Sequence, residues 1–127
     1  MKHMRAILWR WSPAVLVMAI IFIASSMPSQ DLPAFGAWDF LLKKWGHLVG
    51  YALLGASYLN GLAAEGRITR RKLLWAIVLA SVYAVSDEFH QSFTPGRNPS
   101  AADVAIDTVG AAMGSLLWPR IKALRIR

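Results

Sequence analysis

Four apolar stretches divide this chain, and each is long enough to cross a lipid bilayer as a helix. They cover about residues 11–27, 45–64, 73–89 and 101–118, and a helix needs roughly 17 to 25 residues to span a hydrocarbon core about 30 Å thick. Lipid offers the backbone no hydrogen-bond partners, so an open sheet is excluded and helices are expected. The stretches predict an all-α polytopic membrane protein, a four-helix transmembrane bundle in which residues 1–127 form a single domain.

The composition agrees with this fold class. Of the 127 residues, 56% are hydrophobic, and the mean hydropathy is +0.41, which is too apolar for an ordinary soluble protein of this size. The net charge of +7 could suggest nucleic acid, but the basic residues flank the apolar stretches, so we expect a membrane and no nucleic acid as partner. The absence of cysteine excludes disulfides, thiolate metal sites and a cysteine nucleophile.

The basic residues also predict an orientation. The N-terminal tail, the connection around residues 65–72 and the C-terminal tail hold 11 of the 14 basic residues, and such segments stay in the cytoplasm. Both termini are then cytoplasmic, with Glu65, Arg125 and Arg127 on the same side. The first stretch also resembles a secretory signal peptide. Because it is long for one, we expect a retained helix.

Acidic and other polar side chains fall inside the predicted spans, close to their extracytoplasmic ends. At 1.5 Å per residue, Asp87 lies about 22 Å along the third span, so Asp87 and Glu88 are inside the hydrocarbon core. Asp107 lies about 9 Å below the outer boundary, and His47 and Tyr51 lie about 3 and 9 Å below it. Charges are expensive in lipid, so a functional site is expected in the outer third of the bilayer.

Helical spacing sorts these side chains by face. Three pairs are four positions apart and share a face: His47 with Tyr51, Asp87 with Gln91, and Asp103 with Asp107. The neighbours Asp87 and Glu88 are about 100° apart and cannot point the same way. Two glycine pairs with the same spacing allow helices to approach closely, which would bring His47 and Asp107 into one cluster: Gly46 with Gly50, and Gly110 with Gly114.

The cluster is compatible with several kinds of chemistry, which the residues leave open. Carboxylates with a histidine act as general acids or bases, so Asp87, Glu88 and His47 are candidate catalytic residues. The same carboxylates could hold a divalent metal through oxygen, with His47 or His90 supplying nitrogen. The candidate ligand-binding residues are the other polar side chains around the cluster: Tyr51, Gln91, Arg97, Asp103, Asp107 and Lys44.

Arg97 stands within the turn sequence PGRNP at residues 95–99. We expect this turn to hold Arg97 over the cluster, where a guanidinium is suited to grip a phosphate or carboxylate. Plainer roles stay open for the charged residues: Arg97 bridging Glu88 or Asp103, Asp103 capping a helix in a capping box with Ser100, and Lys43 and Lys44 as interfacial anchors.

A combined spacing runs through these residues: Lys44-x-x-His47-x-x-x-Tyr51, Asp87-Glu88-x-x-Gln91 leading into Pro95-Gly96-Arg97, and Asp103 followed by Gly110 and Gly114. Over about residues 45–118 it resembles the VanZ-like family of bacterial membrane proteins. The resemblance implies a bacterial cytoplasmic membrane and an accessory role in resistance to antibiotics of the teicoplanin type. Asp107 departs from the family pattern, which usually has asparagine there, and adds a negative charge.

Three functions are compatible with these observations. The first is an accessory protein that binds an anionic lipid headgroup, a lipid-linked envelope precursor or a glycopeptide antibiotic at the extracytoplasmic leaflet. The second is a small membrane hydrolase or transferase with a carboxylate base and a divalent metal as a possible cofactor. The third, an ion- or proton-coupled transporter, is disfavoured because the polar residues stop in the outer third of the spans. Whether the chain is an enzyme, and whether it forms a homo-oligomer, is left open.

Overall fold

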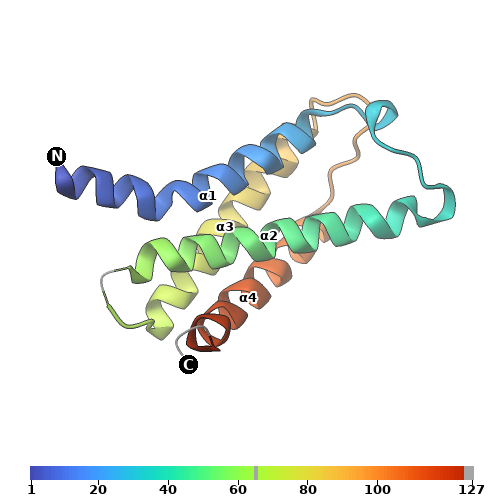
Figure 1. The fold of residues 1–127 in the computed structure, drawn as a ribbon. Coiled ribbons are helices and arrows are strands. Elements are labelled where there is room, and N and C mark those ends of the chain that lie inside the picture. The colour runs from blue at the N-terminus through green and yellow to red at the C-terminus, as the bar shows by residue number, and fades with distance from the viewer. Residues whose placement is uncertain (65, 125–127) are drawn as a thin grey trace.

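Within the residues that the computed structural model describes, 1–64 and 66–124, the chain folds into helices joined by short connections (Figure 1). The predictions for Glu65, Arg125 and Arg127 lie outside these residues. Two 3-10 helices occupy the first connection, η1 Ser29–Asp31 and η2 Gly36–Trp38. The predicted all-α, four-helix architecture is confirmed by the long helices: α1 Lys2–Ser26, α2 Asp39–Ala63, α3 Arg70–Gln91 and α4 Ala101–Leu124.

Each helix extends past its apolar stretch at one end or both, and α1 does so most, beginning at Lys2 instead of residue 11. Pro13 lies inside α1 and has no N–H to donate to the carbonyl of Trp9. The hydroxyl of Ser12 donates to that carbonyl instead, at 2.8 Å. The helix therefore continues through the proline. Hydropathy marks only the apolar part of a helix, whereas lysine and arginine beyond it are good helix formers.

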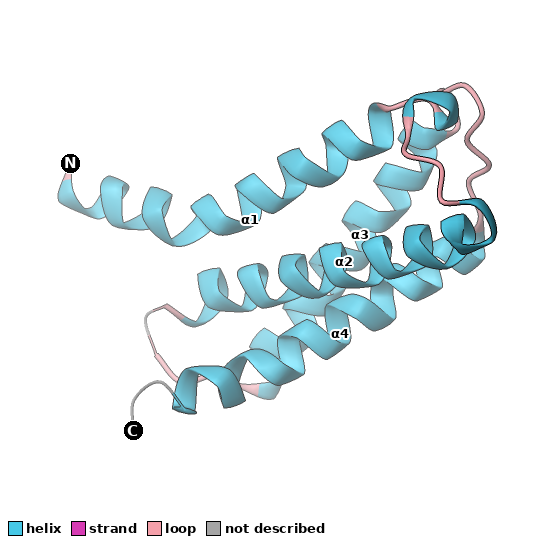
Figure 2. Cartoon of the chain, turned by 45° about the vertical axis from the view of Figure 1, so that its right-hand side comes forward, coloured by secondary structure: helices cyan, strands magenta, loops and turns pink. Residues whose placement is uncertain are grey.

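The helices alternate in direction. Both described chain ends and the connection between α2 and α3 lie at one end of the bundle, and the connections 27–38 and 92–100 lie at the other (Figures 1 and 2). The two connections at the second end contact each other, since the Ser29 N–H donates to the Pro95 carbonyl at 3.3 Å. The span ends that the sequence predicts to be extracytoplasmic thus gather in one place.

The most extensive contact between helices is that of α2 with α4. A Cβ atom at Gly114 would overlap the carbonyl oxygen of Ala52, and one at Gly110 would overlap that of Leu48. Side chains larger than hydrogen at these two positions would force the backbones apart. The role predicted for Gly110 and Gly114 is confirmed.

The other predicted glycine pair, Gly46 and Gly50, does not bring backbones together. A Cβ atom at Gly46 would meet nothing within 4 Å, and one at Gly50 would make an ordinary contact with the side chain of Ile21 at 3.8 Å. The glycine of α2 that takes part in the close approach to α4 is Gly55, where a Cβ atom would overlap the carbonyl of Ala111. Spacing alone does not say which glycines of a helix face its neighbour.

Large apolar side chains cover the outside of the bundle, and several polar side chains are buried inside it beside an apolar core. Large apolar side chains are exposed along the outside of the bundle, for instance Val15, Leu16 and Phe22 on α1, while the buried residues include Asp87, Glu88, Gln91, Asp107 and Ser115. Among the described helices, α1 and α3 are long and apolar enough to cross a membrane. The crossing of α2 and α4 stays a prediction.

We expect Gly114→Ala to destabilise the bundle by about 1–3 kcal/mol or more, because the added methyl group overpacks the contact of α2 with α4. Thermal unfolding in detergent, followed by circular dichroism, measures the change. Gly46→Ala is the matched control, since it gains the same helix propensity in open space. Equal melting temperatures for the two variants would contradict this view of the helix contact.

Candidate functional site

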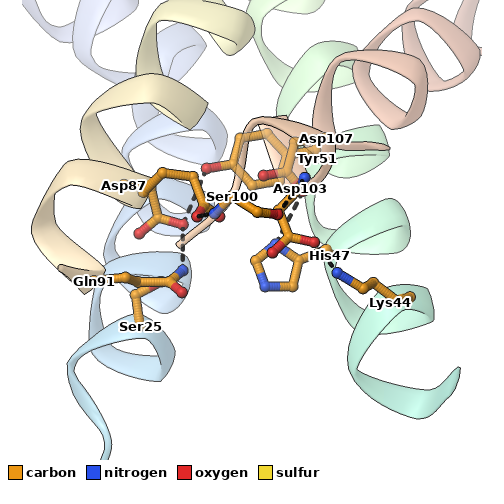
Figure 3. A network of polar contacts seen from close by, with 10 residues as sticks. Ser25, Lys44, His47, Tyr51, Asp87, Gln91, Ser100, Asp103 and Asp107 are labelled. Atoms are coloured by element: carbon orange, nitrogen blue, oxygen red, sulfur yellow. Dashed lines mark hydrogen bonds and ion pairs between the residues drawn. The ribbon is translucent and has the colours of Figure 1, made fainter. Parts of the chain in front are cut away.

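Polar side chains from all four helices meet at the end of the bundle that carries the connections 27–38 and 92–100 (Figure 3). We call this group the polar network. The members on α1 and α3 lie in the last turns of their helices, those on α4 lie in its first two turns, and those on α2 reach from its second turn to its middle, so the antiparallel order of the bundle brings them together. They are Ser25 on α1, Lys44, His47 and Tyr51 on α2, Asp87, Glu88 and Gln91 on α3, and Asp103 and Asp107 on α4.

His47 and Asp107 join α2 to α4 in the network. Nδ1 of His47 lies 2.9 Å from Oδ1 of Asp107, and the Asp107 side chain is completely buried. The close helix approach at Gly110, one turn after Asp107, places the two side chains within reach. The predicted meeting of His47 and Asp107 is confirmed.

Asp87 links α3 to α2 directly and to α1 through Gln91. Its Oδ2 accepts hydrogen bonds from the hydroxyl of Tyr51 at 3.2 Å and from Nε2 of Gln91 at 3.3 Å. The same Gln91 nitrogen lies 3.2 Å from the hydroxyl oxygen of Ser25. Asp87 is only 3% exposed, so these neutral donors provide the hydrogen bonds that water would otherwise provide.

Glu88 turns away from Asp87, as their spacing predicts. Its Oε2 accepts the backbone N–H of Ser100 at 3.0 Å, and the side chain is 6% exposed. The second oxygen, Oε1, has no hydrogen-bond partner among the described residues, and neither has Oδ2 of Asp107. One potential ligand atom from each of His47, Glu88 and Asp107 lies within 4.8 Å of the others. These three residues are the only described group in which a metal-binding arrangement of this kind occurs.

Lys44 and Asp103 form an ion pair at the rim of the network. The positive charge of Lys44 is therefore balanced by Asp103. Ser100 accepts the N–H of Asp103 through its hydroxyl at 3.2 Å, which is half of the predicted capping box. The other half is replaced, because the N–H of Ser100 donates to Glu88 and the Asp103 carboxylate pairs with Lys44.

Arg97 does not contact the acidic side chains of the network. It follows Gly96, whose φ of +74° suits glycine. The Arg97 side chain reaches the C-terminal end of α1. There its Nε donates to the Met27 carbonyl at 3.1 Å and its Nη2 to the Ala24 carbonyl at 2.8 Å. Carbonyls at the end of a helix lack helical partners and carry partial negative charge. Arg97 therefore makes this capping contact and not the bridge to Glu88 or Asp103 that the sequence left open as an alternative.

A cavity of about 270 Å³ opens between α1 and α2 beside the network. Its polar lining includes Lys43, His47, Tyr51 and Arg97, and its apolar wall includes Ile20 and Ile21. Lys43 pairs with Asp39 at 2.9 Å, and both side chains stay partly exposed. The glycines that do not pack, Gly46 and Gly50, also line this cavity. Small residues on α2 therefore make room next to His47.

Ser25 and Thr94 belong to this region but are not predicted from the sequence. Ser25 binds Gln91, and its carbonyl accepts the hydroxyl of Thr94 at 3.3 Å. A serine near the outer end of the first span, at the depth of Gln91, is the signal that could have identified Ser25.

His90, a predicted alternative metal ligand, instead stacks on Phe22 with a centroid distance of 4.4 Å and lies outside the metal-binding group.

We expect Tyr51→Phe to lower the free energy of unfolding by about 1–3 kcal/mol, because it removes a hydrogen bond to a buried carboxylate. Thermal unfolding in detergent provides the measurement. Tyr58→Phe is the control, since the Tyr58 hydroxyl contacts only the weakly accepting sulfur of Met18 at 3.2 Å. A smaller loss for Tyr51→Phe than for Tyr58→Phe would show that the contact with Asp87 is unimportant.

Comparison with known proteins supports the resemblance seen in the sequence. Neither a curated protein nor a solved structure gives a significant match to the chain. The VanZ/LLP1 family pattern matches residues 11–123, which include every residue of the polar network. The chain therefore belongs to the VanZ/LLP1 family and is a membrane protein of that family.

Proposed function

We propose that the protein binds the phosphate headgroup of an anionic lipid or lipid-linked envelope precursor in the extracytoplasmic leaflet of the bacterial cytoplasmic membrane. The observation that carries this proposal is the cavity between α1 and α2, where cationic side chains and His47 lie next to an apolar wall. A lipid has the same two parts, a charged headgroup and a hydrocarbon chain. The wall of Ile20 and Ile21 suits the chain, and the polar lining suits the headgroup.

The charges of the cavity favour an anion. Arg97 uses two of its five N–H groups, through Nε and Nη2, to cap α1. In the described part of the chain it has no acidic partner. The remaining N–H groups keep the planar arrangement that binds phosphate oxygens in pairs. Lys43, which also lines the cavity, shares its charge with the partly exposed Asp39.

The volume of the cavity favours a small headgroup. Sites for drug-sized ligands measure roughly 300 to 1,000 Å³, and this cavity measures about 270 Å³. A phosphate or a small phosphorylated headgroup suits that space, whereas a whole glycopeptide antibiotic is much larger. An accessory role in resistance to such antibiotics would then arise from the envelope precursor that occupies the cavity.

The proposal also requires that all four helices cross the membrane and that the cavity faces the extracytoplasmic side. The excess of basic residues in the tails and in the connection between α2 and α3 supports this orientation. The alternating helices support it as well, since they place the described parts of those three segments at one end of the bundle (Figure 2).

The orientation is testable by labelling single cysteines, because the native chain contains none. In intact spheroplasts, a membrane-impermeant maleimide should label Asn98→Cys and should label Gly66→Cys only after lysis. Both positions are exposed, so access to the reagent decides the result. Labelling of Gly66→Cys in intact spheroplasts would contradict the proposed orientation.

Native mass spectrometry of the protein in detergent, with added phosphatidic acid or phosphatidylcholine, tests headgroup binding. We expect preferential binding of phosphatidic acid, which Arg97→Gln and Lys43→Gln each weaken by about 10-fold, the equivalent of a lost charge-assisted contact. Lys72→Gln is the control, because Lys72 lies at the opposite end of the bundle and contacts the Arg67 carbonyl. Equal binding of the two lipids, or binding of teicoplanin instead, would refute the proposal.

A second candidate, hydrolysis of a lipid phosphate, is favoured by the contact between His47 and Asp107. A carboxylate that accepts a hydrogen bond from one ring nitrogen orients a histidine so that the other nitrogen can act as a general base. His47 also lines the cavity. Release of inorganic phosphate from phosphatidic acid by the wild-type protein, and its loss in Asp107→Asn, would establish this reaction. Binding without release would leave the chain as a binding protein.

A further inference from the structure

Three carboxylates are buried in the polar network, and one basic side chain contacts one of them. Asp87, Glu88 and Asp107 are 3%, 6% and 0% exposed, and His47 is the basic side chain that contacts one of them. Lys44 is directed to Asp103, and Arg97 to the end of α1. Buried ionised carboxylates without compensating charge cost several kcal/mol each.

The hydrogen bonds of these carboxylates are unequally satisfied. Asp87 accepts from Tyr51 and Gln91, so neutral donors hold it in place. Glu88 and Asp107 each keep one buried oxygen with no partner among the described residues, Oε1 and Oδ2 respectively. Buried polar atoms without partners are uncommon in native proteins and often indicate a bound ion or water. The two oxygens belong to residues that also share a metal-binding arrangement with His47.

The geometry of the three residues accommodates one ion. Their potential ligand atoms lie within 4.8 Å of one another, and three points so spaced all lie within about 2.8 Å of a common centre, since 4.8 Å divided by √3 is about 2.8 Å. Bonds from zinc to nitrogen and oxygen measure about 2.0 to 2.2 Å. Side-chain movements of less than about 1 Å would bring all three ligands to such an ion.

We infer that His47, Glu88 and Asp107 bind a divalent first-row transition metal ion, with Zn²⁺ and Mn²⁺ as the best candidates. One imidazole and two carboxylates combine the ligand types that these ions accept, whereas Mg²⁺ and Ca²⁺ prefer oxygen alone. Three protein ligands leave further coordination positions for water or a ligand. The inference goes beyond the proposed binding of lipid and does not depend on it.

The surroundings offer access to such an ion from two sides. His47 lines the cavity of about 270 Å³ between α1 and α2. Glu88 lines a second cavity, of about 320 Å³, next to Pro99 and Ser100. A donor that fixes one of the ligands is also present, since the backbone N–H of Ser100 donates to Oε2 of Glu88. Such contacts orient metal ligands and strengthen binding.

The test measures metal binding by the purified full chain. After removal of metal with a chelator and dialysis, the protein is titrated with Zn²⁺ or Mn²⁺ alone, and bound metal is measured by plasma mass spectrometry. We expect one ion per chain, and at least about 10-fold weaker binding in Glu88→Gln and in Asp107→Asn, which each lose a ligand. Asp31→Asn is the control, because Asp31 is exposed and lies outside the network.

A second measurement does not depend on the folding of any variant. Wild-type protein labelled with ¹⁵N-histidine and loaded with Mn²⁺ should show a nitrogen coupling from one imidazole in pulsed electron paramagnetic resonance. Absence of that coupling would overturn the inference. It would also be overturned by less than a tenth of an ion per chain, or by equal metal content in wild type, Asp31→Asn and folded Glu88→Gln.

Discussion

The close approach of α2 and α4 is the contact on which the polar network depends. Gly110 and Gly114 allow the backbones to meet without intervening side chains, and only then are the short side chains of His47 and Asp107 able to form a hydrogen bond at 2.9 Å. The ion pair of Lys44 with Asp103 follows the same helix pair one turn further out. Packing of small residues thus fixes the positions of charged ones, because a rigid helix contact determines where each side chain begins.

A membrane makes this arrangement favourable, since lipid reverses the usual cost of exposure. The apolar side chains on the outside of α1 and α3 need no partner in lipid, whereas each polar side chain must find one inside the bundle. Asp87 illustrates the result, because a tyrosine hydroxyl and a glutamine amide replace its water. In water the same bundle would expose a large apolar surface. The apolar outer surface and the buried polar network therefore both follow from one requirement, that polar groups in lipid find their partners inside the protein.

Features that follow from helical periodicity could be predicted from the sequence, and features that depend on loop docking could not. The spacing of Asp87 and Gln91 predicts one face, and they share a hydrogen bond. Hydropathy predicts the helices, but it places the start of α1 nine residues late. The helix continues there through charged residues and through Pro13, whose missing hydrogen bond to the Trp9 carbonyl is replaced by one from the Ser12 hydroxyl. The partner of Arg97 is decided by how its turn packs against the end of α1, and residue types alone do not specify that packing.

The cavity and the buried carboxylates cannot act independently, because His47 belongs to both. Asp107 and Asp87 contact His47 and Tyr51, which line the cavity, so a phosphate bound there would feel their charge. Two like unit charges about 6 Å apart would repel by about 3 kcal/mol at an effective dielectric constant near 20. Arg97 and Lys43, which also line the cavity, would offset part of that repulsion. The remainder must be removed by protons or by a cation within the network. The anion binding proposed for this cavity therefore depends on how the buried carboxylates are neutralised.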